Sequence, residues 1–188
     1  MQKKEIIKEL KEELDSKRYE HTLGVAYTAA SLAMAYEMDV EKAYIAGLLH
    51  DCAKCMSDKE RIAYCKKHDI EMTEVELKNP SLLHAKVGSY LAADKYNIKD
   101  EEILSSIKYH TTGKPQMSAM EEIIFVADYI EPMREHDREL PQIRKEAFCD
   151  IKKAIRHIYH NTLSYLSTTT KSLDPMTEEA YKYYLENN

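Results

Sequence analysis

The chain has 188 residues, with 33 acidic and 27 basic side chains and a formal net charge of −6. This length suits one helical domain with a sizeable core. The negative charge argues against a general nucleic-acid-binding protein, whose domain is usually basic, but it is compatible with a small anionic ligand held by a local basic cluster.

The apolar runs and the cysteines indicate the cellular setting. The N-terminus is rich in Lys and Glu, unlike a secretory signal peptide, and no apolar run is long enough to span a membrane. We therefore expect a cytoplasmic protein with free thiols and with neither a membrane nor a nucleic-acid partner. Cys52 and Cys55 are spaced as C-x-x-C, but no second pair completes a zinc site, so we interpret them as core residues.

The pattern of apolar residues predicts an all-α fold. Only four glycines and five prolines interrupt a sequence rich in helix-forming residues, and strand-like alternation never extends beyond a few residues. Ala26, Ala29, Ala30 and Ala33 give one predicted helix a small-residue face for close packing. In chain order, the predicted helices cover residues 2–15, 17–37, 40–53, 57–67, 71–78, 82–95, 101–110, 118–130 and 141–166, with Pro141 in the first turn of the last, and a terminal helix that begins at Asp174 and Pro175.

The end of the chain is rich in tyrosine. Tyr181, Tyr183, Tyr184 and Leu185 lie close together in the terminal predicted helix. Such a cluster suits either internal packing or a contact in a homodimer, and the sequence leaves both open.

A histidine and an aspartate stand together at the end of the apolar segment 46–51 (AGLLHD). A buried, ionised carboxylate without a partner is costly, so Asp51 is expected to be paired or bound to a cation. The His-Asp pairs that begin at His68 and His136 lie in charged segments instead. Only the pair of His50 and Asp51 has an apolar setting, and it predicts a metal site.

Three further histidines and one aspartate lie in apolar or small-residue surroundings on other predicted helices. These are His21, His84, His110 and Asp128. Each histidine alone would usually be a core residue, and Asp128 alone would suit a buried pair with Lys or Arg. Together they favour a metal centre, and mixed imidazole and carboxylate ligands suit iron, manganese or zinc better than calcium or magnesium. Such a centre activates water and neutralises charge on a substrate oxygen, which predicts hydrolysis of a phosphate ester or anhydride.

Basic and hydroxyl side chains near these residues suit the anionic part of such a substrate. Arg18 precedes His21 by one helical turn, Lys54 follows His50 by one turn, and Arg134 follows Asp128. Each alone would usually be a solvated surface charge. The segment 110–113 (HTTG) follows a predicted helix whose end Gly113 is expected to cap, which exposes amides and hydroxyls to a phosphate.

Five segments carry a more specific pattern: 18–25 (RYEHTLGV), 46–54 (AGLLHDCAK), 83–88 (LHAKVG), 109–113 (YHTTG) and 127–134 (ADYIEPMR). Together they resemble the YqeK family of HD-domain phosphohydrolases. The resemblance implies a single-domain HD-domain helical bundle over residues 1–188, with the core motifs in 18–134 and C-terminal helices in 139–188 that complete the domain and the nucleotide pocket.

The same resemblance implies an activity: symmetrical hydrolysis of diadenosine tetraphosphate to two ADP, with one or two divalent transition-metal ions, iron before manganese or zinc. The implied metal ligands are His21, His50, Asp51 and Asp128. The implied catalytic residues are Asp51, which bridges metal and water, and His84 and His110, which assist the leaving group. The implied phosphate-binding residues are Arg18, Lys54, His84, His110, Thr111 and Arg134. The implied nucleoside-binding residues are Thr170, Lys171, Ser172, Leu173, Asp174, Pro175 and Met176.

Three other functions remain open at this point. One is a broader hydrolase of mononucleotides or cyclic nucleotides, which the order of His and Asp residues also permits. Another is a non-catalytic sensor that binds an alarmone nucleotide without turnover. The third is a helical scaffold with hydrogen-bonded core histidines.

Overall fold

The computed structural model describes residues 3–135, 138–169 and 173–187, and in these ranges the chain forms α-helices, one short 3-10 helix and no strand. The elements are α1 (Lys3–Glu13), α2 (Ser16–Ala35), α3 (Val40–Leu49), α4 (Asp58–Lys67), α5 (Glu74–Lys78), η1 (Pro80–Leu82), α6 (Leu83–Asp94), α7 (Glu101–Tyr109), α8 (Ala119–Ile130), α9 (Leu140–Ala147), α10 (Ile151–Ser167) and α11 (Pro175–Glu186). The predicted all-α fold is confirmed.

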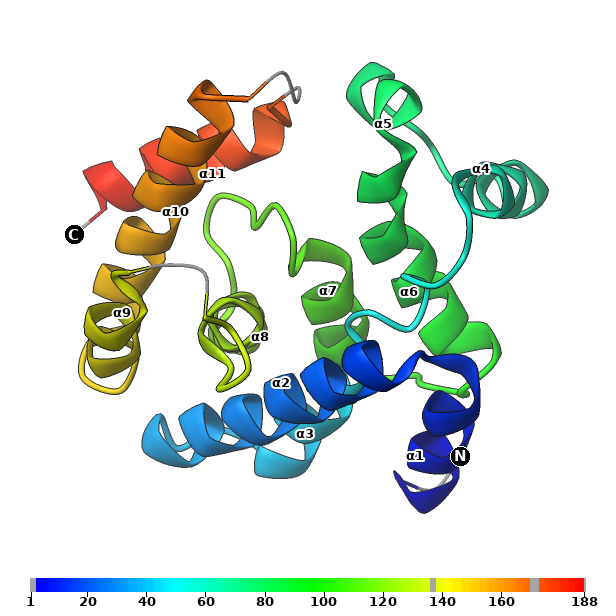
Figure 1. Cartoon of the computed structure of the whole chain (residues 1–188), viewed down its shortest axis with the longest axis horizontal. Coiled ribbons are helices and arrows are strands. Elements are labelled where there is room, and N and C mark those ends of the chain that lie inside the picture. Colours follow the sequence, from blue (N-terminus) through cyan, green and yellow to red (C-terminus); the bar gives the residue numbers. More distant parts are fainter. Residues whose placement is uncertain (1–2, 136–137, 170–172, 188) are drawn as a thin grey trace.

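Helix α8 lies at the centre of the arrangement, with α2 and α3 along one side and α7 beside it (Figure 1). The small-residue face of α2 packs closely, as predicted, and its partner is α3. A Cβ added at Gly47 would lie only 2.7 Å from the Cα of Ala26, so the two backbones approach too closely for a larger residue. The pairing of α2 with α3 therefore fixes where each helix presents its polar residues.

Helix α1 packs against α2 and α3, and two further groups of helices flank the centre (Figure 1). Helices α4, α5 and α6 lie to one side with a small apolar cluster of their own, which includes Cys65, Leu83 and Val87. Helices α9, α10 and α11 lie to the other side and pack against α8 and each other. In the described parts of the chain, no helix is both long and apolar enough to cross a membrane.

The predicted single helix over 141–166 is wrong, because α9 and α10 are separate helices. Asp150 has an extended conformation (φ −154°), and its side chain accepts a hydrogen bond from the backbone N–H of Lys153 as the N-cap of α10. The apolar stripe continued across this break, so its period gave no sign of the turn. Pro141 does lie in the first turn of α9, as expected.

The terminal helix is held to the core by a tyrosine. Tyr184 is buried, and its hydroxyl donates a hydrogen bond to Glu122 of α8 (2.8 Å). Part of the tyrosine cluster thus packs internally, while a homodimer stays a prediction. The interpretation of the C-x-x-C pair as core residues is wrong for Cys55, which is exposed, whereas Cys52 is largely enclosed beside Gly88.

Candidate metal centre

Six predicted site residues from five helices converge on one point, where α2, α3, α6, α7 and α8 meet. The Nε2 atoms of His21 and His50 are 3.3 Å apart, and His21 Nε2 lies 3.2 Å from a carboxylate oxygen of Asp128. On the other side of Asp51, the Nε2 atoms of His84 and His110 are 3.1 Å apart. Residues separated by up to about a hundred positions in the sequence therefore form a single cluster of potential ligand atoms.

Three of the imidazoles are oriented by the same kind of local hydrogen bond, from the ring to a nearby backbone carbonyl. The Nδ1 of His50, His84 and His110 each lies 2.6–2.7 Å from the backbone carbonyl three residues earlier. His50 and His110 directly follow the ends of α3 and α7, where carbonyl groups lack helical partners, whereas His84 lies in the first turn of α6, just after η1. These bonds place the proton on Nδ1 and leave the Nε2 lone pair for the cluster, as in protein metal sites.

His21 is oriented by a side chain instead. Its Nδ1 lies 3.0 Å from the carboxylate of Glu131, which is buried and also accepts the backbone N–H of Met133 (2.7 Å). Gly24 makes room for this carboxylate, because a Cβ there would lie 2.6 Å from Glu131 Oε2. Burial opposes protonation of His21, but hydrogen bonds to Asp128 and Glu131 outweigh it and raise the pKa of His21 to about 9.

Glu131 was not among the predicted site residues. In the sequence, Glu131 stands out only as an acidic residue between the most apolar helix and Pro132. Its hydrogen-bond partner His21 is 110 positions away, so the sequence does not indicate the contact. Only the tertiary fold brings the two together.

Asp51 lies between the two groups of histidines. Its Oδ2 lies 3.7 Å from His50 Nε2 and 3.9 Å from His21 Nε2, while its Oδ1 lies 3.3 Å from His84 Nε2 and 3.5 Å from His110 Nε2. Burial alone would raise the pKa of the Asp51 carboxyl, but the surrounding imidazoles hold it well below its usual range. Asp51 is therefore ionised and deeply buried at the centre of the cluster.

The donor set fits a divalent transition metal. Among the described residues, three overlapping groups each place three ligand atoms within 4.8 Å of one another: His21, His50 and Asp51; His50, His110 and Asp128; Asp51, His84 and His110. Asp51 Oδ1 is buried and accepts no hydrogen bond, which is costly for a carboxylate oxygen unless a cation binds it. Neutral imidazole nitrogens with carboxylate oxygens are the ligands of iron, manganese and zinc.

Basic side chains surround the cluster where it faces solvent. Arg18 donates to Asp51 Oδ2 (2.7 Å), and Arg134 donates to Asp128 Oδ1 (2.8 Å). Lys54 Nζ lies 3.0 Å from His84 Nε2 and 3.8 Å from Asp51 Oδ1, and burial lowers the pKa of its ammonium group. The Asp–Arg pair considered for Asp128 alone thus exists, in addition to the imidazole cluster.

The loop after α7 completes the cluster on the side of α10. Gly113 has a positive φ (63°), and its N–H bonds to the carbonyl of Tyr109 (2.8 Å), so it caps the helix as predicted. Thr111 places its hydroxyl 3.1 Å from the Nε2 atoms of both His84 and His110. Tyr159 of α10 donates to the carbonyl of Thr112 (3.2 Å) and so fixes the loop from outside.

The predicted nucleoside-binding stretch is brought to the site only in part. Thr170, Lys171 and Ser172 lie outside the described residues. Asp174 lines a cavity of about 360 Å³ together with Thr111, and it also caps α11 by accepting the N–H of Met176 (2.9 Å). Leu173, Pro175 and Met176 do not line that cavity.

The helical scaffold and its His and Asp cluster define a class of protein. The sequence pattern of the HD domain matches residues 18–133, so the chain belongs to the HD domain family.

Particular relatives are similar over nearly the whole chain. The symmetrical bis(5'-nucleosyl)-tetraphosphatase of Halalkalibacterium halodurans is 36% identical over 94% of this chain and 93% of the relative. The protein of the same name from Bacillus subtilis is 35% identical over the full length of both chains. The crystal structure of a predicted HD superfamily hydrolase involved in NAD metabolism from Clostridium acetobutylicum has a TM-score of 0.97 at 39% identity, covering 100% of this chain and 99% of that chain. The expected HD-domain fold and family resemblance are confirmed.

Proposed function

We propose that this chain is a metal-dependent hydrolase that cleaves diadenosine tetraphosphate symmetrically into two ADP. The observation that carries the proposal is the position of Asp51, whose two carboxylate oxygens face two different groups of imidazole nitrogens. The names of the two relatives, which cover more than nine-tenths of this chain, support the choice of substrate.

The metal ligands divide into two groups around Asp51. His21, His50 and Asp128 would hold one ion with Asp51 Oδ2, and His84 and His110 would hold a second with Asp51 Oδ1. Iron is the metal we propose, with manganese and zinc as alternatives that the same ligands accept. When bound, such ions lower the pKa of a coordinated water and neutralise charge on phosphoryl oxygens.

The basic residues bind the polyphosphate. Arg18 and Arg134 are paired with Asp51 and Asp128, and each side chain is partly exposed, so each guanidinium can turn from a carboxylate to a phosphate oxygen. Lys54 and Thr111 present an ammonium and a hydroxyl group from the other side of Asp51. These residues orient the anhydride bond over the cluster.

When His84 and His110 hold no ion, proton transfer to the leaving ADP falls to the group formed by these two histidines and Thr111. Their Nε2 and hydroxyl atoms lie within 3.1 Å of one another, so a proton held at any of them can reach a departing phosphate oxygen. With a second ion at the two Nε2 atoms, the Thr111 hydroxyl is the group that still carries a transferable proton. The buried position of both histidines excludes bulk water from this transfer.

Anaerobic incubation of the iron-loaded protein with diadenosine tetraphosphate, with products separated by chromatography, tests the proposal. ADP as the sole product is expected. ATP with AMP would mean that a different phosphorus is attacked, which contradicts symmetrical cleavage. Bound metal without turnover would favour a nucleotide sensor, and turnover of mononucleotides or cyclic nucleotides instead would favour the broader hydrolase.

A further inference from the structure

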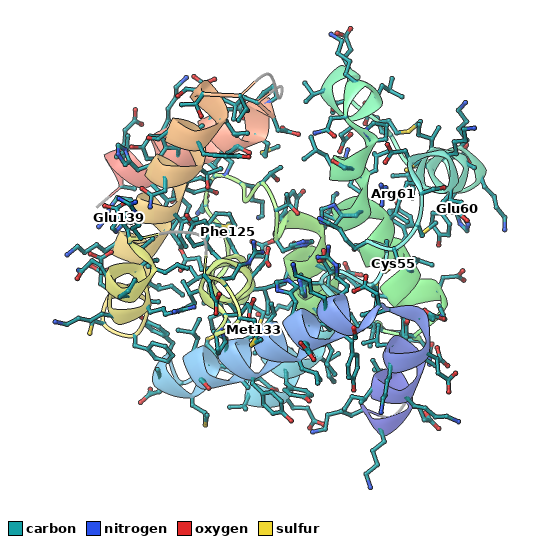
Figure 2. The ribbon with its side chains drawn as sticks, viewed as in Figure 1. Cys55, Glu60, Arg61, Phe125, Met133 and Glu139 are labelled. Atoms are coloured by element: carbon teal, nitrogen blue, oxygen red, sulfur yellow. The ribbon has the colours of Figure 1, made fainter. Side chains whose placement is uncertain are left out.

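The cluster lies between two cavities of different character. The first, which we call the α2 pocket, has a volume of about 510 Å³ and is lined by residues of α2 and of the segment after α8, including Arg18, His21 and Met133. The second, which we call the α10 pocket, consists of adjoining cavities of about 360 and 860 Å³ that share Tyr129, Asn161 and Tyr165. Figure 2 shows Met133 beside α2 and Glu139, a lining residue of the α10 pocket, beside α9 and α10.

Both pockets are continuous with the proposed reaction centre. The α2 pocket includes His21 and Arg134, and Arg134 also lines the larger α10 cavity. The smaller α10 cavity includes Thr111, whose hydroxyl lies 3.1 Å from His84 and His110. A linear polyphosphate laid across the cluster would therefore have one end at each pocket.

The lining chemistry of the two pockets differs. In the α2 pocket, six of the eight lining residues are charged, and His21, which belongs to the cluster, is the only one with an aromatic ring. The α10 pocket contains two tyrosines beside apolar Leu82 and Leu140, with amide and hydroxyl groups between them. Tyr165 is 60% exposed, so its ring offers an open surface in this pocket.

A nucleobase binds best where an aromatic side chain offers a stacking surface, while a phosphate or a solvated ribose needs only charge and hydrogen bonds. Building on the proposed function, we infer that the site recognises only one nucleoside of its substrate: its base stacks on the tyrosines of the α10 pocket, and the α2 pocket holds the far end through its phosphates.

A substrate with a single nucleoside should therefore suffice. Adenosine 5'-tetraphosphate has the same polyphosphate and one base. Hydrolysis breaks the P–O–P bond between its second and third phosphates and consumes one water, giving ADP and pyrophosphate. The far nucleoside of diadenosine tetraphosphate then contributes little to catalytic efficiency.

The test compares three variants on both substrates. Tyr165→Leu removes the stacking ring, Met133→Ala truncates the α2 pocket, and Tyr27→Leu is the matched control, because Tyr27 is 62% exposed but lines neither pocket. Measured quantities are kcat/KM for each substrate and inhibition by inorganic tripolyphosphate, which has no base.

We expect the wild-type protein to cleave both substrates to ADP with kcat/KM values within about tenfold of each other. Tyr165→Leu should lower both values by about tenfold, as for one lost base stack, and leave tripolyphosphate inhibition unchanged. Tyr27→Leu should stay within about twofold of wild type on both substrates. Met133→Ala should leave the ratio of the two kcat/KM values within about twofold of the wild-type ratio, because no second nucleoside binds in the α2 pocket.

Two results would overturn the inference. If diadenosine tetraphosphate yields ADP but adenosine tetraphosphate is not cleaved, both nucleosides are recognised. If Tyr165→Leu weakens tripolyphosphate inhibition as much as it lowers kcat/KM, the ring has a structural role only. If wild type does not cleave diadenosine tetraphosphate at all, the proposed function fails. Calorimetric measurement of ADP binding then tests base stacking in the α10 pocket on its own. Weaker ADP binding to Tyr165→Leu supports stacking there, and equal binding rejects it.

Discussion

The metal centre and the pockets beside it are built in opposite ways. In the centre, His50, His84 and His110 are buried, and a backbone carbonyl three residues away fixes each ring. In the pockets, Met133 in the segment after α8 and Tyr165 of α10 are exposed. The difference indicates that the centre requires fixed geometry for its chemistry, while the pockets need only suitable surfaces.

The largest effect should come from the residue that joins both halves of the centre. Asp51→Asn keeps the shape of the side chain but removes the charge that faces both groups of histidines. We expect metal content to fall to background and kcat/KM to fall by about 1,000-fold or more, with helicity by circular dichroism unchanged.

Asp94→Asn is the matched control, since Asp94 is an exposed aspartate on α6. It should retain metal and activity. An Asp51→Asn variant with activity within tenfold of wild type would show that the centre does not depend on this carboxylate.

The loop that joins the centre to α10 should show the next largest effect. Gly113 has a positive φ, and a Cβ there would overlap the Tyr159 hydroxyl, so Gly113→Ala combines backbone strain with a clash. We expect a loss of about 2–4 kcal/mol in the free energy of unfolding, measured by urea denaturation.

The double variant Gly113→Ala/Tyr159→Phe removes the clashing hydroxyl and should recover about half of that loss, because the backbone strain remains. No recovery would mean that Tyr159 does not limit this loop. Tyr159→Phe alone serves as the reference for the lost hydrogen bond to Thr112.

Variants of Glu131 test whether metal binding requires a fixed orientation of the His21 ring, as it does for the other histidines. Glu131→Ala removes the partner of His21 Nδ1 and should weaken metal binding by about 10–100-fold. Glu131→Gln keeps an oxygen acceptor and should lose less than about tenfold. Gly24→Ala should mimic the alanine variant, because its Cβ displaces the Glu131 carboxylate.

Metal affinity is measured by competition with a chelator of known affinity. If Glu131→Ala binds metal as tightly as wild type, His21 is oriented without this carboxylate. Tight binding by Gly24→Ala together with weak binding by Glu131→Ala would mean that the carboxylate tolerates displacement.

The smallest expected effect is on the pH dependence of stability, through Glu122 of α8 and its hydrogen bond from Tyr184 of α11. Burial raises the pKa of Glu122, although the hydrogen bond from Tyr184 opposes this. The folded state therefore binds a proton more tightly than the unfolded chain, and the stability linked to that proton is present at low pH and lost as pH rises through the raised pKa.

Glu122→Gln lacks this proton but keeps an acceptor for Tyr184, so relative to wild type it should gain stability, about 1 kcal/mol, as pH rises from about 4 to about 7. Thermal unfolding across this range provides the measurement. Exposed Glu12→Gln is the control and should show no such trend. If the difference in stability between Glu122→Gln and wild type stays constant with pH, the raised pKa of Glu122 is contradicted.

Much of the centre could be predicted from the sequence because its ligands are defined locally. An apolar helix that ends in His50 and Asp51 carries the signal within six residues, and the capping role of Gly113 was equally local. The role of Glu131 and the break between α9 and α10 could not be predicted in this way. The first depends on a contact with His21 across the fold, and the second on one capping aspartate, Asp150, within an uninterrupted apolar stripe.

The pockets were the least predictable part. Tyr129 and Tyr165 belong to different helices, and nothing in either local sequence indicates that they line one cavity. Of the described residues in the nucleoside-binding prediction (173–176), Asp174 alone lines this region.

The central claim is that Asp51 joins two metal positions, and anomalous X-ray diffraction from crystals of the iron-loaded protein at the iron edge tests it most directly. We predict two anomalous peaks about 3.5–4 Å apart, one beside His21 and His50 and the other beside His84 and His110, with the Asp51 carboxylate between them. A single peak that Asp51 does not contact, or none in an active crystal, would contradict the account.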